Sequence, residues 1–266
     1  MYDYNDIIFD VDGHVATITL NRPDAYNALS DLMRNELRDV IDRLHKDQNI
    51  RIVIFTGAGK AFCAGGDIKR MKQLVEEGIP YRERLDTYRR DVAGMVREIK
   101  SIRQIVIAKI NGAAYGAGCS IAMLCDIRIA AAEAKFGLPF GKRGLVPDWG
   151  SLYFLPRLIG TSNAIALSST GRGFDAAKAL GIGLVNEVVP AAELDSFVKS
   201  YCEDILQSGP MSLMEGKAAI YAAMESELDT ALEREACLQS ACYCSDDHRE
   251  GVDCFLEKRP PVFTGR

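Results

Sequence analysis

Apolar and polar residues recur along the chain with two different periods, and each period marks an expected element. Alternation with a period of two predicts strands at 7–10 and 15–20, joined by a hairpin turn at Asp12-Gly13. Ser30 is a favoured helix N-cap, and the helical period after it places five apolar residues on one face: Met33, Leu37, Val40, Ile41 and Leu44. Runs of Ile and Val predict buried strands at 52–56 and 105–110.

The later part of the chain changes from mixed to helical patterns. Two charged helices, at 68–77 and 82–102, are expected to form an exposed, mobile flap. Beyond a strand at 126–130 and a helix at 149–159, the pattern is almost entirely helical: 192–207, 211–224, 228–244 and 246–257, with one strand at 186–189. We therefore expect an α/β core over residues 1–190 and a helical region over 191–266.

Composition narrows the class of protein. The 266 residues, 48% of them hydrophobic, can bury the core of one large domain. A formal net charge of −5 argues against nucleic-acid binding as the main role. The first residues lack an apolar signal region and no 18-residue apolar run occurs, so we expect a cytoplasmic protein that does not cross a membrane.

Cysteine and histidine usage argues against metal or disulfide chemistry. The eight cysteines include no CxxC pair, so reduced and mostly packed thiols are expected. With three histidines, the chain is poorly supplied for a zinc site or for a Ser/His/Asp triad. We expect no metal.

Two glycine-rich turns, each leading from a strand into a helix, carry the candidate chemistry. The segment 111–125 turns on Gly112, Gly116 and Gly118, and the segment 60–67 holds Gly65 and Gly66. Such turns leave backbone N–H groups free at the positive end of a helix, where an oxyanion is stabilised. Two turns aimed at one point would make an oxyanion hole. A turn that only lets a helix pack closely on a sheet explains the glycines of 111–125 equally well.

Five motifs, in order, resemble the crotonase or enoyl-CoA hydratase/isomerase superfamily over nearly the whole chain. They are Ala61-Phe-Cys-Ala-Gly-Gly-Asp-Ile68, Asn111-Gly-Ala-Ala-Tyr-Gly-Ala-Gly118, Cys125-Asp-Ile127, Ala134-Lys-Phe-Gly137 and the ending Glu250-Gly-Val to Phe263-Thr-Gly. The resemblance implies an α/β fold, a crotonase-like spiral of strand-strand-helix repeats with a C-terminal helical trimerisation region. It also implies a homotrimer or a dimer of trimers, and acyl-CoA thioester substrates with no separate cofactor.

The resemblance also assigns residues. It implies that the thioester oxygen is held by the N–H groups of Gly66 and Ala117. It further implies a set of residues that bind the CoA part of the substrate: Arg22, Ala25, Ala64, Asp67 and Ile68, with Phe263 and Arg266 reaching the nucleotide bound to a neighbouring subunit.

The catalytic acids of this family are partly absent. Hydratases of the family carry two glutamates, and the matching positions here are Ser120 and Phe140. Asp148 instead matches the single acid-base carboxylate of enoyl-CoA isomerases and resembles that of the phenylacetate-pathway isomerase. Locally, Asp148 is also explained as a helix N-cap. Because a site with an oxyanion hole still needs a proton carrier, we favour Asp148 as the base, with its pKa raised by burial beside Phe140, Leu145 and Trp149.

The favoured function is therefore an enoyl-CoA isomerase, in which Asp148 moves a proton while an enolate rests on the oxyanion hole. An aromatic pocket around Phe140 and Trp149 fits a cyclic or aryl acyl group, although Trp149 is equally explained by packing. Tyr115 is a candidate substrate contact or a core residue. The alternatives are an enoyl-CoA or cyclic dienoyl-CoA hydratase that uses Asp148 alone, a dehalogenase or thioesterase, and a non-catalytic acyl-CoA binder.

Overall fold

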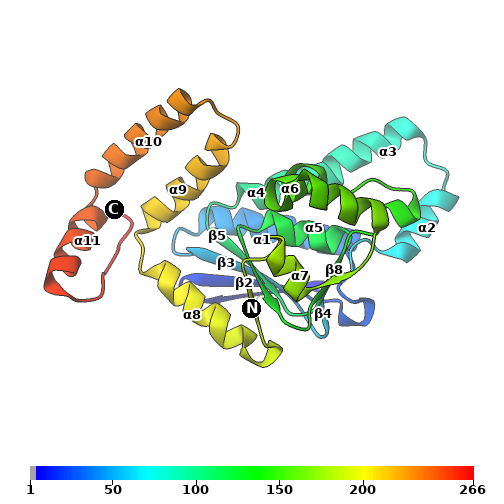
Figure 1. Cartoon of the computed structure of the whole chain (residues 1–266), viewed down its shortest axis with the longest axis horizontal. Helices are drawn as coiled ribbons and strands as arrows, with labels where there is room; N and C mark the ends of the chain where they lie inside the picture. Colours follow the sequence, from blue (N-terminus) through cyan, green and yellow to red (C-terminus); the bar gives the residue numbers. More distant parts are fainter. Residues whose placement is uncertain (1–3) are drawn as a thin grey trace. The chain divides into compact units, whose positions relative to one another are not determined.

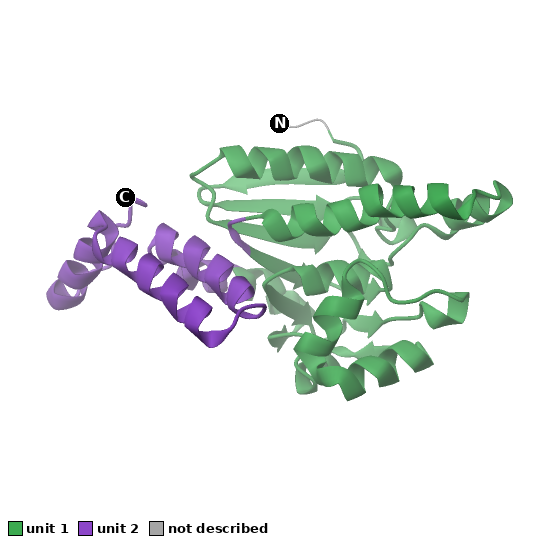
Figure 2. Cartoon of the chain, turned by 90° about the horizontal axis from the view of Figure 1, so that it is seen from above, with its two compact units in different colours: residues 1–102, 106–198 green, residues 103–105, 199–266 purple. Residues whose placement is uncertain are grey.

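The computed structural model describes residues 4–266, which form two compact units (Figure 2). The first comprises residues 4–102 and 106–198, and the second comprises residues 103–105 and 199–266. Within residues 4–266, no helix combines the length and apolar character needed to cross a membrane.

A six-stranded sheet forms the centre of the first unit (Figure 1). Its order is β1 (Ile7–Asp12), β2 (Val15–Leu20), β3 (Ile52–Gly57), β5 (Ile105–Ile110), β7 (Ile127–Ala131) and β10 (Glu187–Val189). Strands β1 and β2 form the predicted antiparallel hairpin, whereas β2 and β3, β5 and β7, and β7 and β10 pair in parallel. All six residues of β3 are buried, as its continuous apolar run predicts.

A second sheet of four short strands was not predicted from the sequence. Its order is β4 (Ala61–Cys63), β6 (Ala113–Tyr115), β8 (Lys135–Gly137) and β9 (Phe174–Asp175). Each repeat of the chain gives one strand to each sheet, β3 then β4, β5 then β6, and β7 then β8, and then continues into helix. This arrangement confirms the predicted strand-strand-helix repeats. Strands of two or three residues are too short to show a period in the sequence.

The helices of the first unit follow the predicted pattern with three exceptions, one of which is α7, a helix that was not predicted. Helix α1 (Asp31–Lys46) begins where Ser30 Oγ accepts a hydrogen bond from Met33 N, and the five predicted apolar residues are buried. Helices α2 (Ile68–Glu76), α3 (Tyr81–Tyr88) and α4 (Gly94–Ser101) follow, then α5 (Ala117–Leu124), α6 (Ser151–Thr170) and α7 (Ala176–Gly181). A π-helical turn joins α3 to α4, and α6 extends beyond its predicted end, with a break at Gly160.

Helices α1, α4 and α5 lie side by side above the six-stranded sheet (Figure 1).

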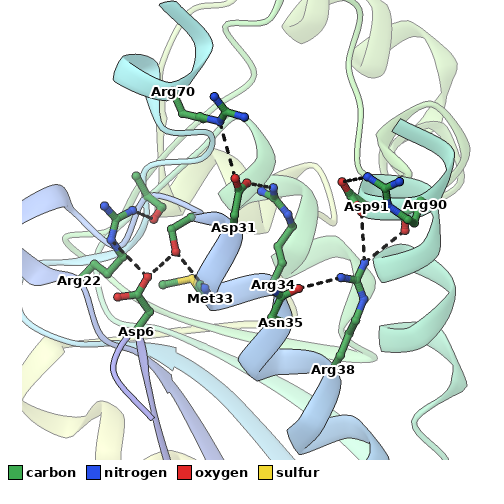
Figure 3. A network of polar contacts seen from close by, with 12 residues as sticks. Asp6, Arg22, Asp31, Met33, Arg34, Asn35, Arg38, Arg70, Arg90 and Asp91 are labelled. Carbon is green, nitrogen blue, oxygen red and sulfur yellow. Dashed lines mark hydrogen bonds and ion pairs between the residues drawn. The ribbon is translucent and has the colours of Figure 1, made fainter. Parts of the chain in front are cut away.

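Ion pairs link α1 to the segment that was expected to form a flap (Figure 3). Arg70 of α2 lies 3.6 Å from Asp31. Arg38 Nη2 lies 3.9 Å from Asp91 and donates to the Arg90 carbonyl at 3.2 Å, and its Nε is 3.2 Å from a Glu98 oxygen. Helix α1 therefore anchors both ends of this segment through charged contacts.

The second unit is helical, as predicted. It contains the end of α8 (Leu194–Leu206), α9 (Pro210–Ala223), α10 (Leu228–Tyr243) and α11 (Asp246–Glu257). Lys217 Nζ donates to the Gln104 carbonyl at 2.7 Å, which ties residues 103–105 to this unit. The buried Asp247 accepts hydrogen bonds from Thr264 N at 2.7 Å and Gly265 N at 2.9 Å. The end of the chain is therefore fixed against α11.

Candidate active site

A cavity of about 540 Å³ opens in the first unit, within the size range of small-molecule sites. Its lining comes from three parts of the chain: residues 22–28 with 64–71, the turn at 115–117, and the segment 139–149. The lining residues include Arg22, Asp24, Ala25, Ala28, Ala64, Gly66, Asp67, Ile68, Lys69, Met71, Tyr115, Gly116, Ala117, Pro139, Phe140, Arg143, Leu145, Asp148 and Trp149.

The two glycine turns meet at this cavity. An ideal Cβ on Gly65, whose φ is +96°, would lie 2.6 Å from the Tyr115 carbonyl oxygen and 3.1 Å from Ala117 N. A Cβ on Gly118 would lie 2.1 Å from the Cys63 carbonyl oxygen, so the helix can approach β4 only with glycine at this position. The glycines therefore allow close backbone packing at both positions. The same close packing brings the two turns together.

Two backbone donors are free where the turns meet. Gly66 and Ala117 both line the cavity, and neither N–H donates a hydrogen bond within the described part of the chain. Ala117 is the first residue of α5, so its N–H is one of those that a helix leaves without an internal partner. The helix dipole adds partial positive charge at this end. The arrangement can stabilise an oxyanion without a charged side chain.

Asp148 is a partly buried acid with one buried, unsatisfied oxygen. Its Oδ1 has no hydrogen-bond partner among residues 4–266. Burial raises the pKa of this carboxyl to about 6, and a hydrogen bond from its own backbone N–H opposes the rise. The cap of α6 is Gly150, and no side chain caps this helix, so the N-cap explanation of Asp148 is wrong.

The backbone beside Asp148 is strained. Trp149 has a φ of +51°, which is rare for a bulky residue, and its side chain is buried. Phe140 is also buried and, like Trp149, lines the cavity, whereas Leu145 is half exposed. The apolar surroundings predicted for Asp148 are thus provided mainly by Phe140 and Trp149.

The position of Tyr115 is compatible with both roles that the sequence left open. It lines the cavity, but a Cβ on Gly137 would lie 2.5 Å from its ring, so the ring packs tightly against the second sheet.

Ser120 takes part in structural hydrogen bonds. Its hydroxyl lies 2.7 Å from Ser151 Oγ and 3.1 Å from the Gly116 carbonyl oxygen, and both serines are buried. Ser151 N in turn donates to the Asp148 carbonyl oxygen at 3.0 Å. This chain of hydrogen bonds joins α5 to the start of α6 and contains no base that could activate a hydroxyl. No pattern in the sequence indicates this role of Ser151.

The residues that the resemblance assigns to CoA lie together on one side of the cavity: Arg22, Ala25, Ala64, Asp67 and Ile68. Arg22 lies 3.3 Å from an Asp67 oxygen and 3.7 Å from an Asp6 oxygen, the latter contact visible in Figure 3. Asp67 also caps α2 by accepting from Lys69 N at 3.0 Å. Arg22 and the Asp67 carboxylate are therefore held in place before any ligand binds.

Phe263 and Arg266 do not line this cavity and belong to the second unit. Phe263 lies beside Gly251 of α11, and the Arg266 carbonyl accepts from Asp247 N at 3.1 Å. Their assignment to the nucleotide of a neighbouring subunit stays a prediction.

The sequence reasoning missed two polar residues of the site. The first is Arg143, which lines the cavity, and the second is Tyr88, which interacts with Asp148. The pKa of Tyr88 is raised by burial and by the charge of Asp148, and the backbone of Trp149 hydrogen-bonds its oxygen. Arg143 lies in the segment that precedes Asp148. Tyr88 lies in the charged helix at 82–102, which was expected to belong to an exposed flap and not to the site. The position of Tyr88 depends on contacts between distant segments, which a single sequence does not reveal.

Comparisons with known proteins give one consistent result. The family model for enoyl-CoA hydratase/isomerase matches residues 10–266. A probable enoyl-CoA hydratase of Mycobacterium tuberculosis is 38% identical over 263 residues, which is 99% of each chain. The 1,2-epoxyphenylacetyl-CoA isomerase of Escherichia coli is 35% identical over 260 residues, 98% of each chain. The crystal structure of an enoyl-CoA hydratase from Bacillus anthracis superposes with a TM-score of 0.92 at 35% identity, covering 98% of this chain and all of that one. These similarities confirm the crotonase-like fold.

Proposed function

The chain belongs to the enoyl-CoA hydratase/isomerase family of enzymes, and on that basis we propose that it is an enoyl-CoA isomerase with Asp148 as its proton carrier. The observation that carries the proposal is the pair of residues Ser120 and Phe140 at the two glutamate positions, together with the largely buried carboxyl of Asp148, whose Oδ1 has no partner among the described residues. Syn hydration uses one group to activate water and usually a second to manage the other proton. Moving a double bond needs one group that takes a proton and returns it.

The proposed reaction proceeds in two steps. Asp148 removes an acidified proton from an unsaturated acyl-CoA, and the electron pair moves to the thioester oxygen as an enolate. The N–H groups of Gly66 and Ala117 stabilise this oxygen. The protonated Asp148 then returns the proton two carbons away, and the double bond ends in its new position. No water is added, so the product has the mass of the substrate.

A second candidate is hydration with Asp148 alone, which the names of the relatives favour. The relative from Mycobacterium tuberculosis and a 36% identical protein of Clostridium acetobutylicum are both named as enoyl-CoA hydratases. Mass spectrometry of linear, cyclic and aryl enoyl-CoAs after incubation in oxygen-18 water separates the two reactions. An isomerase gives products of unchanged mass with a displaced double bond. A labelled hydroxyl group in the product would show a hydratase and overturn the proposal.

The pH dependence of turnover follows from the pKa of Asp148. A base must be ionised, and burial places this pKa at about 6. We expect kcat/KM to be constant above about pH 7 and to fall about tenfold per pH unit below about pH 6. Initial rates with one 3-enoyl-CoA across this range test the expectation. A rate that increases as the pH falls below 6 would instead require the protonated acid in the free enzyme.

The second unit supports a proposed homotrimer or dimer of trimers. It exposes large apolar side chains that a folded unit normally buries, including Phe255 at 82%, Leu256 at 72% and Leu228 at 71%. Light scattering of the purified protein should therefore give three or six times the mass of one chain. A monomeric mass at micromolar concentration would contradict this assembly.

A further inference from the structure

Arg143 differs from the other cationic residues of the cavity in its position and its partners. Arg22 and Lys69 lie among the residues assigned to CoA, and Arg22 is already paired with Asp67. Arg143 lies in the segment 139–149, which also carries Asp148. Its side chain forms one hydrogen bond to a described residue, from Nη1 to the Pro139 carbonyl at 3.3 Å, and no ion pair with a described carboxylate.

The guanidinium of Arg143 has donors available for a ligand. Arg143 lines the cavity, and most of its five N–H donors are unused by the described residues. The side chain can therefore offer hydrogen bonds to a molecule bound in the cavity.

The geometry of the cavity indicates which part of a substrate reaches Arg143. A thioester oxygen at Gly66 and Ala117 places CoA toward residues 22–28 and 64–71. The acyl group must then extend toward Asp148, because this acid has to reach the carbons beside the thioester. In this orientation the acyl group would lie against the segment 139–149, whose other cavity residues include the apolar Phe140, Leu145 and Trp149. A positive charge in such a segment suits an anion on the acyl group.

We propose that Arg143 binds a carboxylate at the far end of the acyl group, so that the substrates are CoA monothioesters of unsaturated dicarboxylic acids. This inference rests on the proposed function for the orientation of the substrate. The planar guanidinium matches a carboxylate with two parallel hydrogen bonds, which lysine or a neutral side chain does not reproduce. Uncharged acyl groups of the same length leave this cation without a partner.

Binding of saturated thioesters tests the inference without any turnover. Dissociation constants are measured by calorimetry for free CoA, glutaryl-CoA, adipyl-CoA and the uncharged acyl-CoAs of equal chain length. The wild type is expected to prefer the carboxylated ligands, and Arg143→Gln is expected to weaken them by roughly tenfold to 100-fold with little effect on the uncharged ones.

Lys142→Gln is the matched control. Lys142 lies in the same turn and carries the same charge, but its side chain packs near Gly171 and does not line the cavity. This variant should bind all ligands as the wild type does, and thermal unfolding of both variants checks their folding.

Two results would overturn the inference. One is a wild type that binds carboxylated and uncharged thioesters equally. The other is an Arg143→Gln variant that binds free CoA and every thioester more weakly by the same factor, since Arg143 would then contact CoA itself. The saturated ligands cannot react as enoyl-CoAs, so neither result bears on the proposed isomerase reaction. Conversely, the binding preference can still be measured if the protein proves not to be an isomerase.

Discussion

Asp148→Asn is expected to lower kcat on a 3-enoyl-CoA by about 1000-fold, with a much smaller change in KM. The amide cannot accept the proton, and general acid-base catalysis by one group contributes roughly 100-fold to 10,000-fold. Steady-state kinetics at pH 8, where the wild-type carboxyl is ionised, gives the comparison. Turnover within a few-fold of the wild type would remove Asp148 from the mechanism.

The same variant is expected to be more stable than the wild type at pH 8. Burial holds the folded pKa of Asp148 at about 6, above the value near 4 of an unfolded chain. The folded state therefore binds this proton more tightly, and its contribution to stability is full below about pH 4 and is lost as the pH rises through 6. Two pKa units correspond to about 3 kcal/mol, which sets the upper limit of the gain.

Unfolding temperatures at pH 4 and pH 8 measure this difference. Asp148→Asn and the wild type should unfold at similar temperatures at pH 4, and the variant should unfold at a higher temperature at pH 8. Asp253→Asn, an equal change of charge on an exposed position of α11, serves as the control. A variant that is less stable than the wild type at pH 8 would show that the buried carboxylate is compensated by contacts in the folded protein.

Ala117→Pro is expected to lower kcat by about 100-fold to 1000-fold, the usual effect of removing one oxyanion donor. Proline lacks the N–H, yet the first position of a helix accepts it, because that N–H has no partner within the helix. The fold should therefore persist while the oxyanion loses a donor.

Ala117→Gly keeps the N–H and is the matched control, expected to retain most of the wild-type turnover. Circular dichroism and the unfolding temperature separate a lost donor from a lost fold. If Ala117→Pro is folded and retains wild-type kcat, the thioester oxygen is held elsewhere.

Long elements were predictable because their pattern repeats several times. Helix α1, its cap at Ser30 and its buried face follow directly from spacing in the sequence. Strands β4, β6 and β8 were missed, since three residues each cannot display a period and their pairing depends on the turns at Gly65 and Gly116. The crotonase-like repeat could therefore be inferred only through family motifs.

Site residues that belong to a family motif could be predicted from the sequence. Site residues whose position depends on tertiary contacts could not. The local sequence also indicated a helix N-cap at Asp148. The helix instead begins at Ser151, because the backbone at Trp149 is left-handed. The burial that raises the pKa of Asp148 depends on how the segment around Phe140 and Trp149 folds over the acid, which the local pattern does not reveal. Arg143 and Tyr88 belong to no motif used for the prediction, and their position at the site follows from packing alone.

The most direct test of the central claim is the fate of a 3-enoyl-CoA in deuterated water, followed by NMR for the wild type and Asp148→Asn. The account predicts that the wild type moves the double bond to the 2-position without adding oxygen from water, that any deuterium gained lies at the carbon that receives the proton, and that the variant moves the double bond far more slowly. Migration of the double bond at the wild-type rate in Asp148→Asn would contradict the single-acid mechanism.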